Sequence, residues 1–340
     1  MQNLRNTIPV IVNVDINKRE VSRYSFYTPA FISENDSVER TVEVTSLPEV
    51  LTAGYTKDSN AYAYCAMAFS QKQRVDSVVL VAKRSLETYV EAYTASNNTL
   101  YYYITLESKD ITDILALSSF LIAERIDKLI FFSKYEDVTT RVKGIPNLVW
   151  WWEAQSWLWD SWEIVSWDSY LDVGLTSNKY PEAAWISYCA NVFPSQMQWL
   201  GKSLVGVESQ KSPLYPEDLI SFMNSVDDND FYTWGSGKTC DGEWIDHKIN
   251  DDWIKWAIQR NVWKLLKESS KVTATRNGVD QIEMKIKEVL EFNLRQNGII
   301  SYKVYNPQLN RNERKASFEF SYEREHAIVG VVTVNGTLYP

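Results

Sequence analysis

Short apolar runs of strand length alternate with helical patterns through the first half of the chain. The runs cover residues 77–82, 100–106 and 128–133, and helical patterns fill residues 86–95 and 111–125 between them. A continuous apolar run predicts a strand that is covered on both faces. Strands of this kind, alternating with helices, are typical of a layered α/β fold with a mostly parallel sheet. We therefore expect a mixed α/β, sandwich-like core.

The residues before these runs add further expected elements. The segment 7–15 is β-branched and places Val10, Val12 and Val14 on one face of a strand, and residues 27–33 read as another strand. A short helix is expected from Leu47, with Ser46 as its N-cap and Pro48 in its first turn. A second helix is expected over residues 59–71.

The last third of the chain has a different pattern. We expect an amphipathic helix over 216–226, opened by Pro216, and two long helices over 251–269 and 279–297. Asn277 is expected to cap the second long helix, and Gly298 to end it. Strands are expected at 299–305, 317–322 and 328–334. This pattern predicts an α+β C-terminal domain with two long helices and a terminal β-sheet.

These patterns suggest four parts. We expect an N-terminal arm at 1–20, an α/β domain at 21–230, an α+β domain at 231–325 and a C-terminal arm at 326–340. Within the α/β domain, residues of about 135–179 show no regular pattern and are expected to form an irregular, Trp-rich insertion, which either faces outward or is an added subdomain.

Composition narrows the classes of function. The 340 residues are 45% hydrophobic and 23% charged with a net charge of −9, which excludes a largely disordered chain and disfavours a general nucleic-acid binder. The N-terminus has no secretory signal pattern, and no apolar stretch is long enough to cross a bilayer. We therefore expect a soluble protein made without export, with no membrane partner. Its three separated cysteines, Cys65, Cys189 and Cys240, are expected to be reduced and buried.

For each motif that could serve catalysis, a cofactor or a metal, a purely structural role explains the residues better. His247 and His326 have no metal-ligand spacing, and Gly235–Thr239 resembles the end of a phosphate-binding loop but lacks its first glycine and its following helix. We expect a glycine-rich turn there. The sequence thus predicts no enzyme activity, no cofactor and no metal.

Tryptophan is concentrated in one segment. Seven of the fourteen tryptophans lie between residues 150 and 167, near Glu153, Asp160 and Glu163. Large aromatic side chains most often fill a core or an interface between subunits. Stacking on sugar rings, with the carboxylates as a glycosidase pair, is the alternative interpretation.

Several stretches, in this order along the chain, together resemble one family, the contractile tail sheath proteins of phages, in particular a compact subgroup. The stretches are residues 8–14, 45–50, 61–71, 77–81, 180–185, 237–246, 252–254, 271–278, 297–300 and 325–330. The likeness covers roughly 7–84 and 180–340, and the Trp-rich segment departs from it.

The resemblance implies a structural virion protein in the phage tail, assembled in the host cytoplasm. Sheath subunits form six-fold rings that stack around an inner tail tube, and contraction drives the tube into the host envelope. The implied partners are further copies of the chain, the inner tube protein, and baseplate and tail terminator proteins. The N- and C-terminal arms of such proteins add strands to neighbouring subunits. The implied strand-exchange residues are Ile8, Val10, Val12, Val14, Ile328, Val329, Val331, Val332 and Val334.

The residues themselves are consistent with such arms, because an open sheet edge recruits foreign strands and both termini are β-branched. Two other functions stay open at this point: another structural component of a phage tail, and a carbohydrate-binding protein that uses the Trp-rich segment.

Overall fold

The computed structural model describes residues 26–134, 137–152, 180–207, 220–225, 231–235, 237–312 and 315–326. They divide into two compact units, one of residues up to Asp252 and one of residues from Trp253 on. The expected strands at 7–15 and 328–334, and most of the Trp-rich segment, lie outside the described residues. The domain and arm limits expected from the sequence therefore remain predictions.

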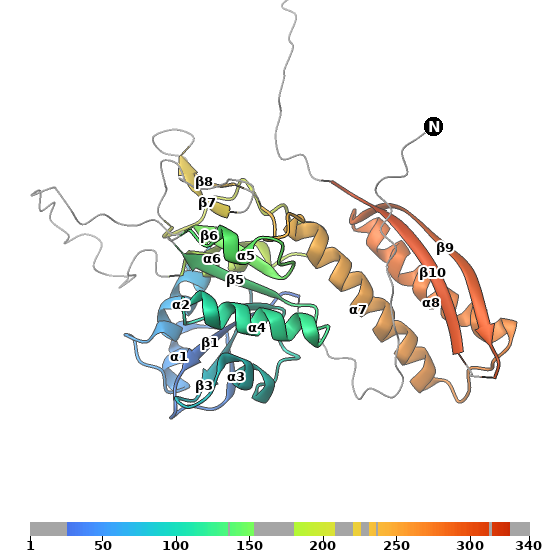
Figure 1. Cartoon of the computed structure of the whole chain (residues 1–340), viewed down its shortest axis with the longest axis horizontal. Coiled ribbons are helices and arrows are strands. Elements are labelled where there is room, and N and C mark those ends of the chain that lie inside the picture. Colours follow the sequence, from blue (N-terminus) through green and yellow to red (C-terminus); the bar gives the residue numbers. More distant parts are fainter. Residues whose placement is uncertain are drawn as a thin grey trace, which may run out of the picture. The chain divides into compact units, whose positions relative to one another are not determined.

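The first unit is built on an eight-stranded sheet (Figure 1) with the order β2-β3-β1-β4-β5-β6-β7-β8. Neighbouring strands from β3 to β7 run parallel, whereas β2 and β8 pair antiparallel at the two edges. The strands are β1 (Pro29–Glu34), β2 (Thr41–Val44), β3 (Val78–Lys83), β4 (Tyr103–Leu106), β5 (Leu129–Lys134), β6 (Leu148–Trp152), β7 (Ile220–Ser225) and β8 (Phe231–Gly235). The mostly parallel α/β sheet predicted from the apolar runs is confirmed.

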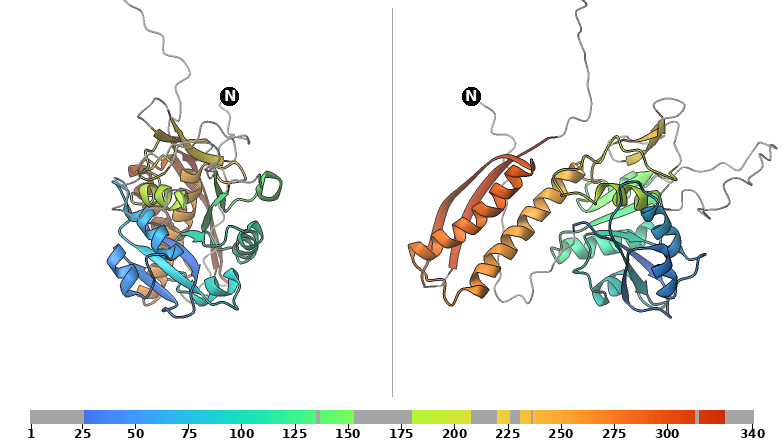
Figure 2. Two further views of the ribbon diagram at one scale, coloured as in Figure 1. Left: turned by 90° about the vertical axis from the view of Figure 1, so that its left-hand side faces the viewer. Right: turned by 180° about the vertical axis from the view of Figure 1, so that it is seen from behind.

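Helices cover both faces of this sheet (Figure 2). They are α1 (Leu47–Thr52), α2 (Asn60–Phe69), α3 (Tyr89–Ala95), α4 (Ile111–Ala123), α5 (Thr139–Val142) and α6 (Pro181–Cys189). On one face, side chains of α3 and α4 pack with Ile32, Val81 and Ile130 in a single apolar core. On the other face, α2 and α6 pack through aromatic rings, and α1 lies beside α2.

Adjacent strand residues point to opposite faces, as the pleat of a strand requires. Phe132 stacks on Trp150 in the α3–α4 core, with ring centroids 6.3 Å apart. The preceding residue, Phe131, meets Trp185 of α6 edge-on at 5.8 Å on the other face. The continuous apolar runs of the sequence therefore have a physical cause, since every side chain of β3 and β4, and of β5 up to Ser133, is buried.

Polar residues fix where the helices begin. The Ser59 side chain accepts a hydrogen bond from the Tyr62 amide at the start of α2, and Asp110 accepts one from the Thr112 amide at the start of α4. Thr88 and Glu91 form a reciprocal capping box at α3. Because of this box, α3 begins at Tyr89 and not near residue 86 as expected.

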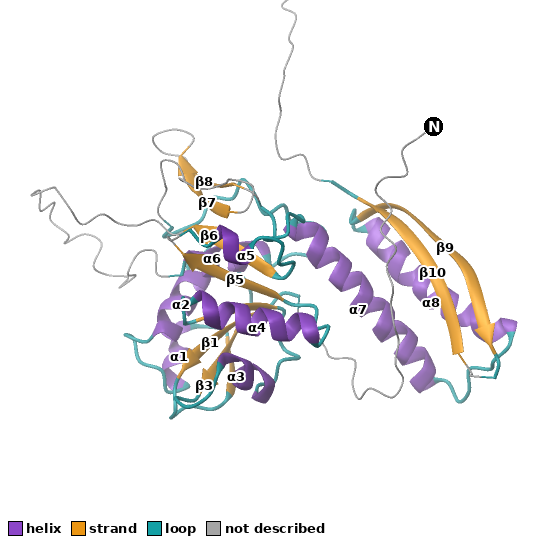
Figure 3. Cartoon of the chain, in the orientation of Figure 1, coloured by secondary structure: helices purple, strands orange, loops and turns teal. Residues whose placement is uncertain are grey.

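The second unit contains a helix pair and a two-stranded antiparallel sheet (Figure 3). Its elements are α7 (Ile245–Glu268), of which the first two turns belong to the first unit, α8 (Arg276–Arg295), β9 (Ile299–Asn310) and β10 (Lys315–Arg324). The predicted α+β part with two long helices and a terminal sheet is confirmed. Helix α7 begins six residues before its expected start at 251.

Two local predictions are wrong. Residues 220–225, expected in a helix, form strand β7, because the segment pairs with β6 on one side and β8 on the other. The N-cap of α8 is Thr275 and not Asn277. Its end is close to the expected one: Asn297 takes the left-handed conformation (φ 58°), and the Gly298 amide donates to the Asn293 carbonyl at 3.0 Å.

In the described part of the chain, no helix is both long and apolar enough to span a membrane.

Candidate assembly site

The β9–β10 hairpin is the candidate site for assembly. Its two strands are 12 and 10 residues long and pair from Ile299↔Arg324 to Asn310↔Lys315. The register shifts twice, and each shift leaves one extra residue on β9, around Asn306–Pro307 and at Ile300. A bulge is a place where a strand tolerates proline, which cannot donate to the ladder.

One face of this hairpin is the packed face. Phe320 and Tyr322 are buried against Ile286 and Leu290 of α8 and against the apolar face of α7, and Phe318 and Val304 pack at the margin of the same cluster. The strict alternation of these residues along β10 confirms the pattern predicted for 317–322.

The other face of the hairpin carries exposed and mostly polar side chains, namely Ser301, Lys303, Tyr305, Ser317, Glu319 and Glu323. The Ser301 hydroxyl donates to Glu323 at 3.3 Å across the strands. On the packed side, the Tyr302 hydroxyl donates to Glu291 of α8 at 3.1 Å. Partial burial, together with this bond to a carboxylate, raises the pKa of Tyr302. These contacts fix the hairpin to its helix and leave its edges out of the packing.

Both outer edges of the hairpin are available for pairing. The sheet has the order β10-β9, and among the described residues no further strand pairs with either edge. Such an edge presents a row of backbone N–H and C=O groups and is a template for a strand from another chain. The predicted strand-exchange residues at 8–14 and 328–334 lie outside the described residues, so their pairing stays a prediction.

A polar anchor that the sequence analysis missed holds the start of α7 on the first unit. The Tyr102 hydroxyl donates to Asp252 at 2.7 Å, and the Lys248 ammonium donates to the other oxygen of the same carboxylate at 2.9 Å. Burial and the neighbouring Asp252 raise the pKa of Tyr102 well above its ordinary value, so the hydroxyl remains a donor. The spacing of Lys248 and Asp252, four residues apart on a helix, is the one sequence signal of this anchor.

The other candidate sites have structural roles where the structure describes them. The turn expected at 235–239 lies slightly later in the chain: Gly235 ends strand β8, and the Gly242 amide donates to the Thr239 carbonyl at 2.9 Å within a bridge between Lys238 and Trp244. Gly237 and Gly242 have positive φ. Trp150 and Trp151 are buried in the two core layers. For these two tryptophans the core interpretation is confirmed; Glu153, Asp160 and Glu163 lie outside the described residues.

The described cysteines and His247 are buried side chains. Cys65, Cys189 and Cys240 are free and buried as expected, and burial raises the pKa of each thiol. His247 is a buried helix residue whose Nδ1 lies 3.5 Å from Glu243. Within the described ranges, no group of three or more His, Cys, Asp or Glu is placed to hold a metal ion.

Chains from several solved contractile assemblies have a similar fold. A chain of the anti-feeding prophage helical sheath in its contracted state matches with a TM-score of 0.62 at 11% identity, covering 99% of each chain. A chain of the contracted PVC sheath complex, from an extracellular contractile injection system, matches with a TM-score of 0.66 at 11% identity, covering 99% of this chain and 96% of that one. A chain of the anti-feeding prophage baseplate matches with a TM-score of 0.64 over the full length of both. The molecule therefore has the fold of contractile sheath proteins.

The sequence of the C-terminal part matches one family of contractile sheath proteins. Residues 245–309, which span α7, α8 and nearly all of β9, match the family model of the E217 tail sheath protein gp31-like C-terminal domain. The sheath tail protein Lin1278 from Listeria innocua also shares the fold, with a TM-score of 0.56 at 9% identity over 87% of this chain and 94% of that one. No curated protein sequence gives a significant match. The resemblance to contractile tail sheath proteins is confirmed.

Proposed function

We propose that this chain is the sheath subunit of a contractile tail, which polymerises as stacked six-fold rings around an inner tube and contracts to drive that tube through a host envelope. The sheath fold over the whole chain and the sheath-type family match at 245–309 support this proposal. The observation that carries it is the β9–β10 hairpin, which is packed on one face and has no other described strand paired with either edge.

In this proposal the terminal segments are the links between subunits. Residues 8–14 and 328–334 add strands to the hairpins of neighbouring copies, with Ile8, Val10, Val12 and Val14 in one arm and Ile328, Val329, Val331, Val332 and Val334 in the other. Main-chain hydrogen bonds hold such strands, and the side chains at alternate positions supply register. The links persist while the subunits rotate as rigid bodies between an extended and a contracted packing, which is the behaviour of a bistable array.

The role is mechanical and not catalytic. Its partners are further copies of the chain, an inner tube protein, and baseplate and tail terminator proteins. The protein functions in the virion as part of the phage tail after assembly in the host cytoplasm. The relatives named above as parts of a sheath and of a baseplate support this placement.

Deletion of residues 1–16 or of residues 326–340 tests the arms. We expect each deletion to leave a folded monomer that forms no tubes in negative-stain electron microscopy, under conditions in which the intact chain does. Ordered tubes from both truncated chains would contradict the arm mechanism.

A paired substitution gives a finer test. Val10→Pro with Val12→Pro removes two backbone donors and should abolish tubes, whereas Val10→Thr with Val12→Thr keeps β-branching and donors and should retain them. Equal tube formation by the two variants would show that this segment does not pair as a strand.

A further inference from the structure

Charge is distributed very unevenly along the chain. Residues 253–326 contain 14 Lys and Arg against nine Asp and Glu, a net charge of +5, while the whole chain carries −9. The remaining residues therefore carry −14. Because opposite charges attract, the positive part of one copy favours contact with the negative part of a neighbouring copy.

Three of these 14 cations lie on one face of α7. Residues Trp256, Arg260, Trp263, Lys264 and Lys267, which we name the basic stripe, follow helical spacing opposite the buried Ile254, Ile258 and Val262. The Arg260 guanidinium lies 5.2 Å from the centroid of the Trp256 ring, and the Lys267 ammonium lies 4.6 Å from that of Trp263. The aromatic rings hold Arg260 and Lys267 in place, and the Lys264 ammonium lies 3.9 Å from the Glu268 carboxylate. All three cations remain exposed.

An acidic turn with an apolar tip projects from the first unit. It comprises the loop 35–39 and residues 84–91, and its tip is Leu86, whose side chain is 99% exposed. A single exposed leucine is ordinary on a mobile loop, but this turn is held in one conformation. The acidic turn therefore presents Leu86 at a fixed position.

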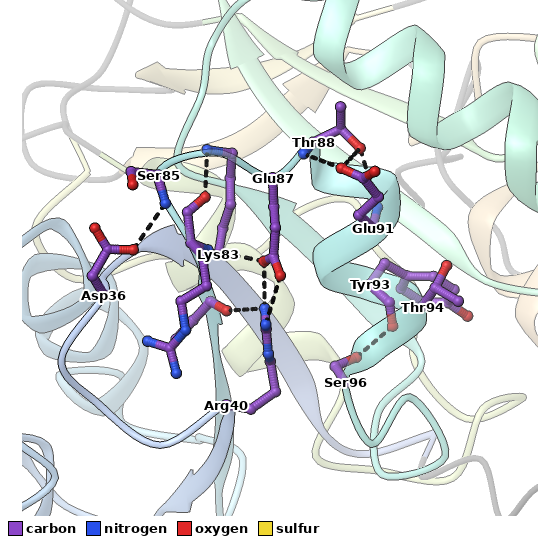
Figure 4. Close-up of polar contacts among 12 residues, drawn as sticks. Asp36, Arg40, Lys83, Ser85, Glu87, Thr88, Glu91, Tyr93, Thr94 and Ser96 are labelled. Atoms are coloured by element: carbon purple, nitrogen blue, oxygen red, sulfur yellow. Dashed lines mark hydrogen bonds and ion pairs between the residues drawn. The ribbon is translucent and has the colours of Figure 1, made fainter.

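Hydrogen bonds from both ends fix the acidic turn (Figure 4). The Arg84 guanidinium donates to the carbonyls of Asn35 at 2.6 Å and Val38 at 2.8 Å, and the Ser85 amide donates to Asp36 at 2.9 Å. Arg40 binds Glu87 with both terminal nitrogens, at 2.6 and 2.7 Å. Preorganisation of this kind reduces the entropy lost when a partner binds.

In the acidic turn, most carboxylates are exposed to solvent and the cations are buried or half-buried. Asp36, Glu39 and Glu91 are exposed residues, whereas Lys83 is buried and Arg40 and Arg84 are half-buried. Since the cations are used in bonds within the turn, the surface around Leu86 is negative and complements the basic stripe.

We propose that the basic stripe of one copy binds the acidic turn of the next copy, with Leu86 seated between Trp256 and Trp263. This inference rests on the proposed function, because it needs copies that assemble. Two different patches meet in such a contact, so it is heterologous. Such a contact forms a ring if the rotation between copies closes and a filament if it does not, and a stack of rings can use either.

A charge exchange between two full-length variants tests this contact. Variant A carries Lys264→Glu and Lys267→Glu, and variant B carries Ser37→Lys and Glu39→Lys, two exposed positions of the loop 35–39. The Ser37 amide, which donates to Asn35, is retained in variant B. In sedimentation velocity at low ionic strength, we expect the intact chain to associate, A and B alone to associate about tenfold more weakly, and an equimolar mixture of A and B to recover the association. Added salt should weaken association of the intact chain, because the contact is exposed.

The apolar tip has its own test and control. Leu86→Ser should weaken association of the intact chain severalfold, whereas Ile122→Ser, at the 47% exposed Ile122 of α4, should not.

A monomeric intact chain at low ionic strength, or association of A and B equal to that of the intact chain, would overturn the proposal. If the intact chain, A and B all form tubes equally well, this contact is wrong while the sheath function stands. If none forms tubes but the mixture still recovers association, the contact stands and the sheath function fails.

Discussion

Glu87 is the acceptor at the centre of the acidic turn. Its carboxylate accepts hydrogen bonds from both terminal nitrogens of Arg40 and from the Arg84 amide, the last at 3.0 Å. These bonds, the one from Arg40 foremost, lower the pKa of Glu87 to about 2. A planar guanidinium bound to a carboxylate through two bonds is among the stronger polar contacts in proteins.

We expect Glu87→Gln to lower the free energy of unfolding by about 1–2 kcal/mol near neutral pH. The native pKa lies below the unfolded value of about 4.3, so the contribution is complete above that value and is lost as the pH falls toward 2. Urea denaturation of the wild type and the variant from pH 7 to pH 2 measures this. The difference should shrink below about pH 4.5, while the exposed Glu39→Gln should change stability by less than about 0.5 kcal/mol throughout. A difference that is constant with pH would contradict the assignment.

At the scale of elements, the start of α7 depends on one buried carboxylate. Asp252 is almost fully buried and accepts bonds from Tyr102 and Lys248. Removal of one donor leaves a buried charge only partly satisfied, which costs more than loss of a bond between neutral groups.

Tyr102→Phe should therefore destabilise the chain by about 1.5–3 kcal/mol. Tyr101→Phe is the matched control, because its hydroxyl is 2.9 Å from the neutral Ser96 hydroxyl and its loss should cost only about 0.5–1.5 kcal/mol. Chemical denaturation compares the two. Equal costs would show that the charge of Asp252 adds nothing to the anchor.

The sequence predicts an element when the element's own residues carry its pattern of apolar and polar positions. It does not predict an element that forms only because distant strands pair with it. Strands β3, β4 and β5 were predicted because burial on both faces makes each an apolar run. The segment 220–225 was assigned to a helix after Pro216, because its pairing partners, β6 and β8, are not visible in its own residues. Strand β6 lies where the sequence shows no regular pattern, and it continues the parallel sheet beside β5.

At the scale of the molecule, two cores stabilise two compact units. Ile130 belongs to the core of the first unit and Leu290 to that of the second, and both are fully buried. Units with separate cores can unfold separately.

We expect two transitions in scanning calorimetry. Leu290→Ala and Ile130→Ala should each cost about 2–5 kcal/mol and lower the midpoint of a different transition. If both substitutions shift one shared transition, the chain unfolds as a single cooperative body and the two cores are thermodynamically coupled.

The sequence by itself determined the α/β layer, the two long helices, the alternation along β10 and the buried cysteines, because each follows from which faces of a short segment avoid water. It also indicated the resemblance to sheath proteins, whereas the strand-like termini stay a prediction. Only the tertiary structure decided that, in the part of the chain it describes, no further strand pairs with the β9–β10 hairpin, and that Tyr102 meets Asp252 across 150 positions of sequence. It alone placed Leu86 on a fixed turn. These features depend on contacts between distant segments, and no local pattern of residues encodes which distant groups will meet.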